Sequence, residues 1–364
     1  MKKLGFILCD LGATGGAEKT FSIIANHLAD DYMIKVISYK YTDKCYYPLD
    51  HRIEIISLFP KNSKYRERHI LLPKFFTKLR AIINGLDIIV MVSSASALGL
   101  LATCGMKNKK VITWEQTSLG NEIYQTRKRV FCQWLSARKS NVLIQLTKKN
   151  AAIAKEMFPY KHLKVDFIYN PINEVLELNN LPEKNKKRII TLARIDRVKG
   201  LELLIAVAEQ VLKKHSDWQW DIYGQVSDNV YEQEIKEKLK HCTVTNRLSF
   251  HAPISDVKTE LCNSSLYVMT SRYEGLPMSL LEAKSCRLPI IAFDCSTGPS
   301  EIVIDGVNGD LIPCYDIDCM ANKINILIEN DNKWQKYQEH AYDEIEKFMV
   351  KNIINKWKKY LILQ

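Results

Sequence analysis

The chain has 364 residues, more than one hydrophobic core usually organises, so we expect two domains. Its 46% apolar and 26% charged residues are ordinary for a soluble globular protein. Lys and Arg outnumber Asp and Glu by 52 to 41, and the resulting net charge of +11 favours an anionic partner such as a membrane surface, a nucleic acid or a phosphorylated substrate.

Cysteine usage and apolar runs indicate the compartment. The 10 cysteines are scattered without a C-x-x-C pair, which predicts reduced, buried thiols in a cytosolic protein and argues against a metal cluster. The basic start M-K-K leads into an apolar run that stops at Asp10 without a cleavage site, so a β-strand is favoured over a signal peptide. Residues 88–106 lack charge but have Ser93, Ser94 and Ser96 near their centre, so we expect a buried strand and then a helix.

The first predicted strand, Leu4 to Cys9, leads through a glycine-rich turn into a helical pattern from Ala17 to Leu28. Strand, glycine turn and helix make the first half of a Rossmann-like unit, with backbone amides exposed at the turn. The turn holds Gly15 and Gly16 but is not G-x-G-x-x-G, so no nicotinamide site is predicted. Further strands are predicted at residues 33–39, 88–92, 111–114, 141–146 and 165–169.

A basic amphipathic segment covers residues 61–80, where seven basic residues and one acid alternate with leucines and phenylalanines. Such a segment can lie on an anionic bilayer, or it can be a solvated face over a buried stripe, and the sequence leaves both interpretations open. No nucleic-acid partner is predicted, because no binding module accompanies the segment. The candidate membrane-surface residues are Lys64, Arg66, Arg68, Lys74, Phe75, Phe76, Lys78 and Arg80.

Polar residues follow two predicted strands at their carboxyl ends, where parallel sheets face their ligands. Glu115 and Gln116 end the strand at residues 111–114. In the second half, Arg194 and Lys199 lie between a strand that starts at Arg188 and the next helix. Cations at such a point form a phosphate site, because charge-assisted hydrogen bonds add to the helix amides, although a basic turn with helix-cap contacts is the alternative. Further strands are predicted at residues 218–223, 247–250, 266–270 and 288–293.

Residues 271–301 carry the densest group of candidate residues. Two acids, Glu274 and Glu282, flank a Gly-Leu-Pro step in which Pro277 is expected at the first helical position. The free amides of this first turn would form an anion site around residues 275–279. An acid on each side of a phosphate-sized site suggests a ligand with hydroxyl groups at both ends and phosphate between them, which is the shape of a nucleotide sugar. Two surface glutamates at this spacing also occur by chance.

The same region resembles the donor site of retaining glycosyltransferases with the GT-B fold, specifically family 4. The matching residues are S-R-Y-E-G-L-P-M-S-L-L-E-A from Ser271, an apolar strand, and T-G-P-S-E-I-V-I-D-G-V-N-G-D-L-I-P from Thr297. The resemblance implies an α/β fold of two Rossmann-like domains with parallel sheets that face a central cleft. It implies an acceptor-binding domain at residues 1–170, a linker at 171–187, a donor-binding domain at 188–335, and C-terminal helices at 336–364 that return to the first domain.

The resemblance also implies roles. In family 4, the residue matching Glu274 faces the donor hexose, that matching Glu282 binds the ribose hydroxyls, and those matching Arg194 and Lys199 hold the diphosphate, so Glu274, Arg194 and Lys199 are the implied catalytic residues. Relatives often carry a histidine near Glu115 that this sequence lacks, so Glu115 and Gln116 are the acceptor-side candidates. The implied donor-binding residues are Gly15, Gly16, Arg194, Lys199, Gly224, Ile254, Glu274, Gly275, Leu276, Pro277 and Glu282.

By this resemblance the protein is expected to be a retaining transferase that needs no metal ion or other cofactor. It would move a hexose or N-acetylhexosamine from a UDP-sugar to a lipid-linked or surface-polysaccharide acceptor, as a monomer or weak oligomer on the cytoplasmic face of the plasma membrane. The alternatives are a GDP-mannose-type transferase, a nucleotide-sugar isomerase or hydrolase, and a non-enzymatic membrane scaffold. Asp316 and Asp318 form an Asp-x-Asp tripeptide, which is interpreted as a helix cap and not as a metal site.

Overall fold

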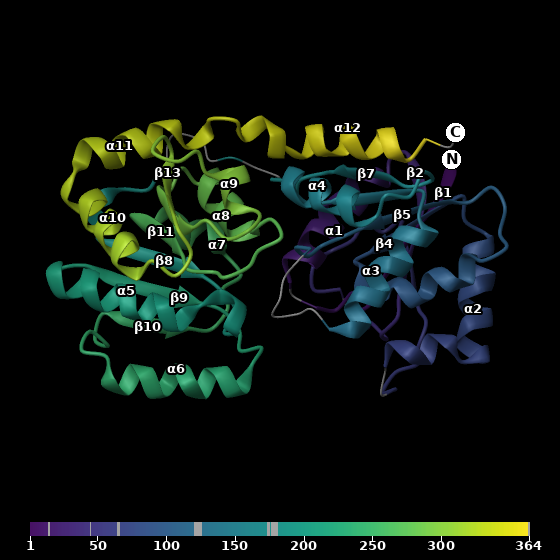
Figure 1. Ribbon diagram of the computed structural model, residues 1–364, viewed down its shortest axis with the longest axis horizontal. Helices are drawn as coiled ribbons and strands as arrows, with labels where there is room; N and C mark the ends of the chain where they lie inside the picture. The colour runs from purple at the N-terminus through teal and green to yellow at the C-terminus, as the bar shows by residue number, and fades with distance from the viewer. Residues whose placement is uncertain are drawn as a thin grey trace. The chain divides into compact units, whose positions relative to one another are not determined.

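Two parallel β-sheets organise the chain (Figure 1), which we describe from a computed structural model. The structure describes residues 1–362 apart from 14, 44, 64–65, 120–125, 173–174 and 176–180. One compact unit is Met1–Asn173 with Phe348–Gln364, and the other is Glu174–Lys347. The prediction of two Rossmann-like units with parallel sheets is confirmed. No helix in these described ranges combines the length and the apolar character needed to cross a bilayer.

The first unit has a seven-stranded sheet in the order β3-β2-β1-β4-β5-β6-β7, and all neighbouring strands are parallel. Its central strands are fully buried apolar runs, as expected for a sheet covered on both faces. The edge strand β3 was not predicted, because it has only four residues and none is fully buried. The strands are β1 Lys2–Leu8, β2 Tyr32–Ser38, β3 Glu54–Ser57, β4 Ile88–Val92, β5 Lys110–Trp114, β6 Val142–Gln145 and β7 Lys164–Phe167.

The helices of the first unit begin at recognisable caps. Thr147 accepts a hydrogen bond of 3.1 Å from the Asn150 amide at the start of α4, and Thr126 accepts one of 3.2 Å from the Arg129 amide at the start of α3. Helix α3 was not predicted from the sequence. The helices are α1 Gly16–Leu28, η1 Glu67–Leu71, α2 Pro73–Asn84, η2 Ser94–Thr103, α3 Arg127–Lys139, α4 Lys148–Met157 and α12 Val350–Tyr360.

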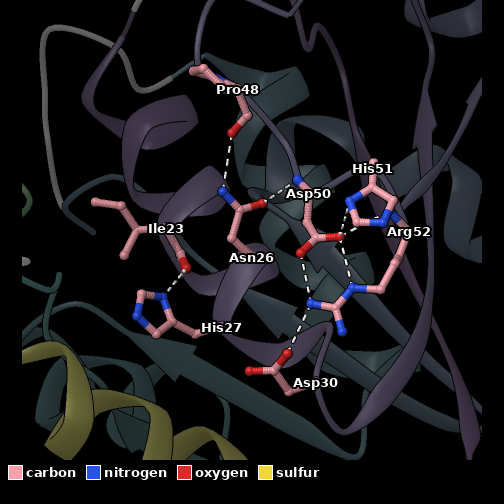
Figure 2. A network of polar contacts seen from close by, with 8 residues as sticks. All are labelled: Ile23, Asn26, His27, Asp30, Pro48, Asp50, His51 and Arg52. Atoms are coloured by element: carbon pink, nitrogen blue, oxygen red, sulfur yellow. Dashed lines mark hydrogen bonds and ion pairs between the residues drawn. The ribbon is translucent and has the colours of Figure 1, made fainter.

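Side-chain contacts hold the loop between β2 and β3 on helix α1 (Figure 2). Asn26 donates a hydrogen bond of 3.1 Å to the Pro48 carbonyl and accepts one of 2.8 Å from the Asp50 amide. Arg52 reaches both Asp50 and Asp30, at 2.7 and 2.8 Å. The hydrogen bonds from Arg52 hold the pKa of Asp50 well below its ordinary value. Asn26 therefore replaces the backbone partners that this loop lacks.

The C-terminal helix α12 packs on the first unit and lies beside the labelled β2 and β7 in Figure 1. The buried ring of Trp357 meets the Trp114 ring edge to face at 4.9 Å. An ion pair of 2.6 Å joins Lys358 to Asp31. The chain returns to this unit at Phe348, so residues 336–347 belong to the second unit.

The second unit has a six-stranded parallel sheet in the order β10-β9-β8-β11-β12-β13. The strand order reverses between β8 and β11, as it does between β1 and β4 in the first sheet. Open α/β sheets bind ligands at such a point, because consecutive loops there leave toward opposite faces. The strands are β8 Arg188–Leu192, β9 Gln219–Tyr223, β10 Leu248–His251, β11 Leu266–Met269, β12 Ile290–Phe293 and β13 Gly309–Ile312.

Two helix starts in the second unit test the sequence analysis. Asp316 caps α10 by accepting a hydrogen bond of 3.0 Å from the Cys319 amide, so the interpretation of Asp-x-Asp as a cap is confirmed. The expectation for Pro277 was wrong by one residue, because its ψ of 112° is extended and Met278 is the first helical residue. The helices are η5 Lys184–Lys186, η6 Arg197–Lys199, α5 Leu201–Lys214, α6 Asn229–His241, α7 Val257–Cys262, α8 Met278–Ser285, α9 Pro299–Ile302, α10 Ile317–Glu329, α11 Asp331–Glu339, η7 His340–Tyr342 and η8 Ile345–Phe348.

The packing of α12 gives a stability prediction. Trp357→Ala should lower the free energy of unfolding by about 3 to 5 kcal/mol, because it removes a fully buried ring and leaves a cavity against Trp114. Urea denaturation followed by circular dichroism measures this loss, and Asn355→Ala on the exposed side of α12 is the control. Equal unfolding midpoints for the two variants would show that α12 does not stabilise the first unit.

Candidate functional site

Two loops at the strand-order reversal of the second sheet carry most of the candidate residues. Residues 193–200 follow β8 and contain Arg194 and Lys199, and residues 270–277 follow β11 and contain Glu274. Because β8 and β11 are neighbours in the sheet, both loops leave from the same carboxyl edge.

An ion pair joins these loops. Lys199 Nζ lies 2.6 Å from Glu274 Oε1, and the two side chains are only 17% and 10% exposed. A charge-assisted bond of this length between poorly solvated groups fixes both side chains, and removing one partner would leave the other charge without compensation. The structure therefore brings together two of the three predicted catalytic residues.

The third predicted catalytic residue, Arg194, lies on the same loop but is half-exposed. Its Nη2 atom is 3.0 Å from Asp196 Oδ2. Asp196 is buried and also accepts hydrogen bonds from the Val198 amide at 3.0 Å and from Ser227 Oγ at 3.3 Å. Asp196 thus orients a guanidinium group that keeps part of its donor surface open to solvent.

Arg272, to which the sequence analysis assigned no role, holds the two loops together. Its amide donates to the Val198 carbonyl at 2.7 Å, and its Nη1 donates to the Arg197 carbonyl at 2.6 Å. Thr270 Oγ1 adds a bond of 3.2 Å to the Lys199 carbonyl. These contacts set the position of Lys199 relative to Glu274. Arg272 lies within the S-R-Y-E-G string, but the string alone does not show that its guanidinium group donates to a backbone carbonyl.

Two glycines allow close backbone approach around the site. A Cβ atom on Gly224 would lie 1.9 Å from the Ala193 carbonyl oxygen, so any side chain would push the strand ends apart beside Arg194. Gly298 has φ +103°, and a Cβ there would lie 2.8 Å from Pro277 Cδ. The T-G-P-S-E string therefore packs closely against the Glu274 loop. Thr297 Oγ1 also donates a hydrogen bond of 2.7 Å to the Glu274 carbonyl.

Helix α8 starts directly after this loop. The Pro277 carbonyl accepts bonds from the amides of Leu280 at 3.2 Å and Leu281 at 3.3 Å, where the helical hydrogen-bond pattern begins. The start of a helix favours negative charge, because the backbone dipoles of the helix point their positive ends toward it. The start of α8 therefore adds positive potential near the Lys199 and Glu274 pair.

Glu282 lies half-buried in the second turn of α8. Burial raises the pKa of the Tyr267 hydroxyl, and the charges of Glu282 and Glu274 raise it further. Both carboxylates thus act electrostatically on the same buried hydroxyl.

The segment after β10 lies beside the end of β9. The Gly224 amide donates to the His251 carbonyl at 3.2 Å, and the His251 ring stacks on Tyr223 at 4.6 Å. Ile254, a predicted donor-binding residue, is half-buried three residues further on. The structure thus places Gly224 and Ile254 along the same edge of the sheet as Arg194.

In the first unit, Gly15 and Gly16 mark the start of α1, where Gly15 is the N-cap and has no side chain with which to cap the helix. A donor-binding role for these two glycines stays a prediction. This turn follows β1, next to the strand-order reversal of the first sheet.

Glu115 is buried at the carboxyl end of β5, inside a set of donors. Glu115 Oε1 accepts hydrogen bonds from Thr117 Oγ1 at 2.9 Å, the Gln116 amide at 3.1 Å and Ser93 Oγ at 3.4 Å, while Oε2 accepts one from the Ser94 amide at 3.3 Å. Gln116 Nε2 is also buried, and no described residue accepts a hydrogen bond from it. Glu115 is thus held rigidly, while Gln116 Nε2 has no acceptor among the described residues.

The candidate membrane residues of segment 61–80 divide into two groups. Phe75 packs on Phe59 at 4.1 Å and Phe76 joins the same core, while Lys78 and Arg80 donate to backbone carbonyls, Arg80 at 2.9 and 2.8 Å. Arg66, Arg68 and Lys74 are exposed, and Lys64 lies outside the described residues. The segment therefore uses both phenylalanines for packing.

The part of the chain that the structure describes contains no group of three His, Cys, Asp or Glu side chains that could hold a metal ion. The second unit instead offers two cations, helix-start amides and two acids. This arrangement can bind a diphosphate flanked by hydroxyl groups.

Comparison with known proteins agrees with this geometry. Residues 176–344 match the model of the family "Glycosyl transferases group 1". The chain is 27% identical to an uncharacterized glycosyltransferase of Haemophilus influenzae, over 99% of this chain and 100% of that protein. It is 22% identical, over 99% and 98%, to a Campylobacter jejuni N-acetyl-D-galactosaminyltransferase named for a diphospho-undecaprenol-linked substrate.

The fold is also found among solved structures. The crystal structure of Anabaena HepE in complex with UDP-glucose superposes with a TM-score of 0.83 at 19% identity and covers 99% of both chains. This similarity shows the GT-B fold, as predicted from the sequence.

One buried cation in α8 has no counter-ion bond. Lys284 is 2% exposed, and none of the described residues accepts a hydrogen bond from its Nζ. Burial lowers the pKa of Lys284 from 10.5 to about 8, with repulsion from Lys347 adding to this and attraction from Asp343 and Glu344 opposing it. Since the unfolded chain holds this proton more tightly than the folded one, Lys284 destabilises the fold fully below pH 8, and this cost disappears as the pH rises toward 10.5.

Lys284→Met should therefore stabilise the protein at pH 7 by about 2 to 3 kcal/mol, and the gain should shrink as the pH approaches 10. Melting temperatures across this range measure the effect, and Lys238→Met on the exposed face of α6 is the control. A gain of equal size at every pH would show that methionine merely packs better, and a loss would show that the ammonium group has a partner.

Proposed function

We propose, from the premise that residues 176–344 form a glycosyl transferases group 1 domain within a GT-B fold, that this protein transfers a sugar from a nucleotide diphosphate donor. The observation that carries the proposal is the Lys199–Glu274 pair, set between Arg194 and the start of α8. It supplies cations for a diphosphate and a carboxylate for the attached sugar within one compact site.

The preferred donor is a UDP-hexose or UDP-N-acetylhexosamine. HepE, whose fold this chain shares, was crystallised with UDP-glucose. In this chain, Glu282 would bind the ribose hydroxyls and the edge near Gly224 and Ile254 would contact the base. Thermal-shift screening with UDP- and GDP-sugars tests the choice, because a ligand at about 100 times its dissociation constant adds roughly 2.7 kcal/mol of stability.

The proposed reaction retains the configuration of the sugar. The bond between the sugar's C1 atom and the β-phosphate oxygen breaks, and a new bond forms from C1 to the acceptor oxygen on the same face. The acceptor proton passes to an oxygen of the departing phosphate. Arg194, Lys199 and the helix-start amides would stabilise the charge that develops on the diphosphate, so fixed side chains would take the role that a metal ion has in other enzymes.

Glu274 has two tasks in this scheme. In the free protein it keeps Lys199 in place through the 2.6 Å contact. When the donor binds, the diphosphate would compete for Lys199, and Glu274 would position the sugar and support positive charge on its C1 atom. Glu274 would then interact more strongly with the transition state than with the bound donor, and only such a difference accelerates the reaction.

For the acceptor we propose a lipid-linked saccharide or a growing surface polysaccharide, bound by the first unit. A relative that aligns over nearly the whole chain is named for an undecaprenol-linked substrate. Glu115 and Gln116 are the candidate contacts, since one is fixed by hydrogen bonds and the other has a buried Nε2 with no described acceptor. The protein would then work at the cytoplasmic face of a membrane.

Glu274→Gln tests the proposed chemistry. The amide still accepts a hydrogen bond from Lys199 but lacks the charge, so turnover should fall by at least about 100-fold while the fold is kept. The measurement is sugar release from whichever nucleotide sugar most raises the melting temperature, with circular dichroism as the check on folding. Glu237→Gln, on the exposed side of α6, is the matched control. Turnover equal to the wild type in Glu274→Gln would remove the proposed role.

A further inference from the structure

Helix α3 of the first unit exposes apolar side chains in a strongly basic setting. Val130, Phe131 and Trp134 are 49%, 48% and 41% exposed, and the rings of Phe131 and Trp134 stack at 5.8 Å. The helix has five basic residues and no acid, namely Arg127, Lys128, Arg129, Arg138 and Lys139. Its other side is covered, since Cys132 and Leu135 pack into the core. The exposed residues therefore form an outward face that no described part of the fold buries.

The spacing places cations at both ends of this face. Arg127, Phe131 and Trp134 follow one another at intervals of four and three residues, and Arg138 lies four residues further, so all of them share one side of the helix. Arg138 also lies 5.9 Å from the Trp134 ring and 6.0 Å from the Tyr160 ring. We call the group Arg127, Val130, Phe131, Trp134 and Arg138 the α3 face.

We infer that the α3 face docks on a bilayer rich in anionic phospholipid. Apolar and tryptophan side chains flanked by arginine are typical of helices that lie in the membrane interface, where the rings enter the headgroup boundary and the cations meet lipid phosphates. Each basic residue near an anionic surface strengthens binding about fivefold, so a helix without acids is matched in charge to such a surface.

Docking through α3 would help the protein reach its acceptor, an inference that rests on the proposed lipid-linked acceptor. Arg129, in the first turn, donates to Thr117 Oγ1, and Thr117 donates in turn to Glu115. The helix follows β5, and Figure 1 labels it beside β4 and β5. Docking through α3 would bring the lipid surface close to the carboxyl edge that holds Glu115. An acceptor could then stay in the membrane while its saccharide end reaches the site.

Segment 66–80 offers a matched comparison. Leu71 and Leu72 are 44% and 49% exposed, nearly the same as the α3 residues, and they lie near the exposed Arg68 and Lys74. If exposed apolar residues beside basic residues were sufficient for bilayer binding, the Leu71 and Leu72 region and the α3 face would bind vesicles equally. The α3 face differs in having two stacked aromatic rings between its cations.

Binding is measured by co-sedimentation of the full chain with vesicles of phosphatidylcholine alone or mixed with equal parts of phosphatidylglycerol. The wild type should bind the mixed vesicles and release them as the ionic strength rises from about 0.1 M to about 1 M, where screening shortens from about 10 Å to about 3 Å. The double variant Phe131→Ala, Trp134→Ala should bind at least about tenfold more weakly. The control Leu71→Ala, Leu72→Ala should bind like the wild type.

Two further measurements separate docking from misfolding. The double variant Arg127→Gln, Arg138→Gln keeps the rings and should bind roughly 25-fold more weakly to the mixed vesicles. Trp134 is 41% exposed, while the other tryptophans are 7% exposed or less, so a shift of the emission to shorter wavelength on vesicle binding reports on Trp134. That shift should be absent in Trp134→Phe.

The inference fails if the wild type binds neither vesicle, if the Phe131 and Trp134 variant binds like the wild type, or if the Leu71 and Leu72 variant alone loses binding. It also fails if the α3 face joins two copies, which would appear as a wild-type dimer and a monomeric α3 variant in sedimentation velocity, without vesicle binding. None of these measurements uses turnover. A protein that docks but releases no sugar would contradict the proposed function and leave the docking intact.

Discussion

The contact between Lys199 and Glu274 is the constraint that the rest of the site serves. Opposite charges that are largely withdrawn from water stabilise each other only when their geometry is fixed, because each has lost hydration that a loose contact does not replace. The surrounding features meet this need. Arg272 holds the backbone before Lys199, and Thr297 with Gly298 supports the backbone around Glu274. The sheet contributes by placing β8 and β11 side by side at the point where its strand order reverses.

The same arrangement explains what could be predicted from the sequence. The inner strands are short apolar runs between glycine or polar turns, and such runs have few interpretations other than buried parallel strands. The charged residues at their carboxyl ends could therefore be assigned to one edge of a sheet before any coordinates were known. The pairing of Lys199 with Glu274 could not, since they are 75 positions apart and only the sheet order brings them together.

Helix α3 and the role of Arg272 were missed by the sequence analysis for a related physical reason. Helix α3 buries the polar Gln133 and Ser136 beside Leu135 but exposes Phe131 and Trp134, so its apolar residues are divided between two faces and do not form the single stripe of a core-facing helix. Arg272 was overlooked because its partners are the Arg197 carbonyl and the carboxylate of Glu202, 70 positions away, and no residue pattern reveals either contact. In both cases the side chains serve a purpose other than filling a core, and such purposes leave little periodic signal.

The central claim is that Lys199 belongs to a diphosphate site that exists before the donor arrives. Isothermal titration calorimetry with UDP, in buffer containing EDTA, tests it most directly. The account predicts that the wild type binds UDP without added metal, that Lys199→Met binds at least about tenfold more weakly, and that Glu274→Gln binds as well or better because Lys199 is freed from its partner. An unchanged UDP affinity in Lys199→Met would contradict it.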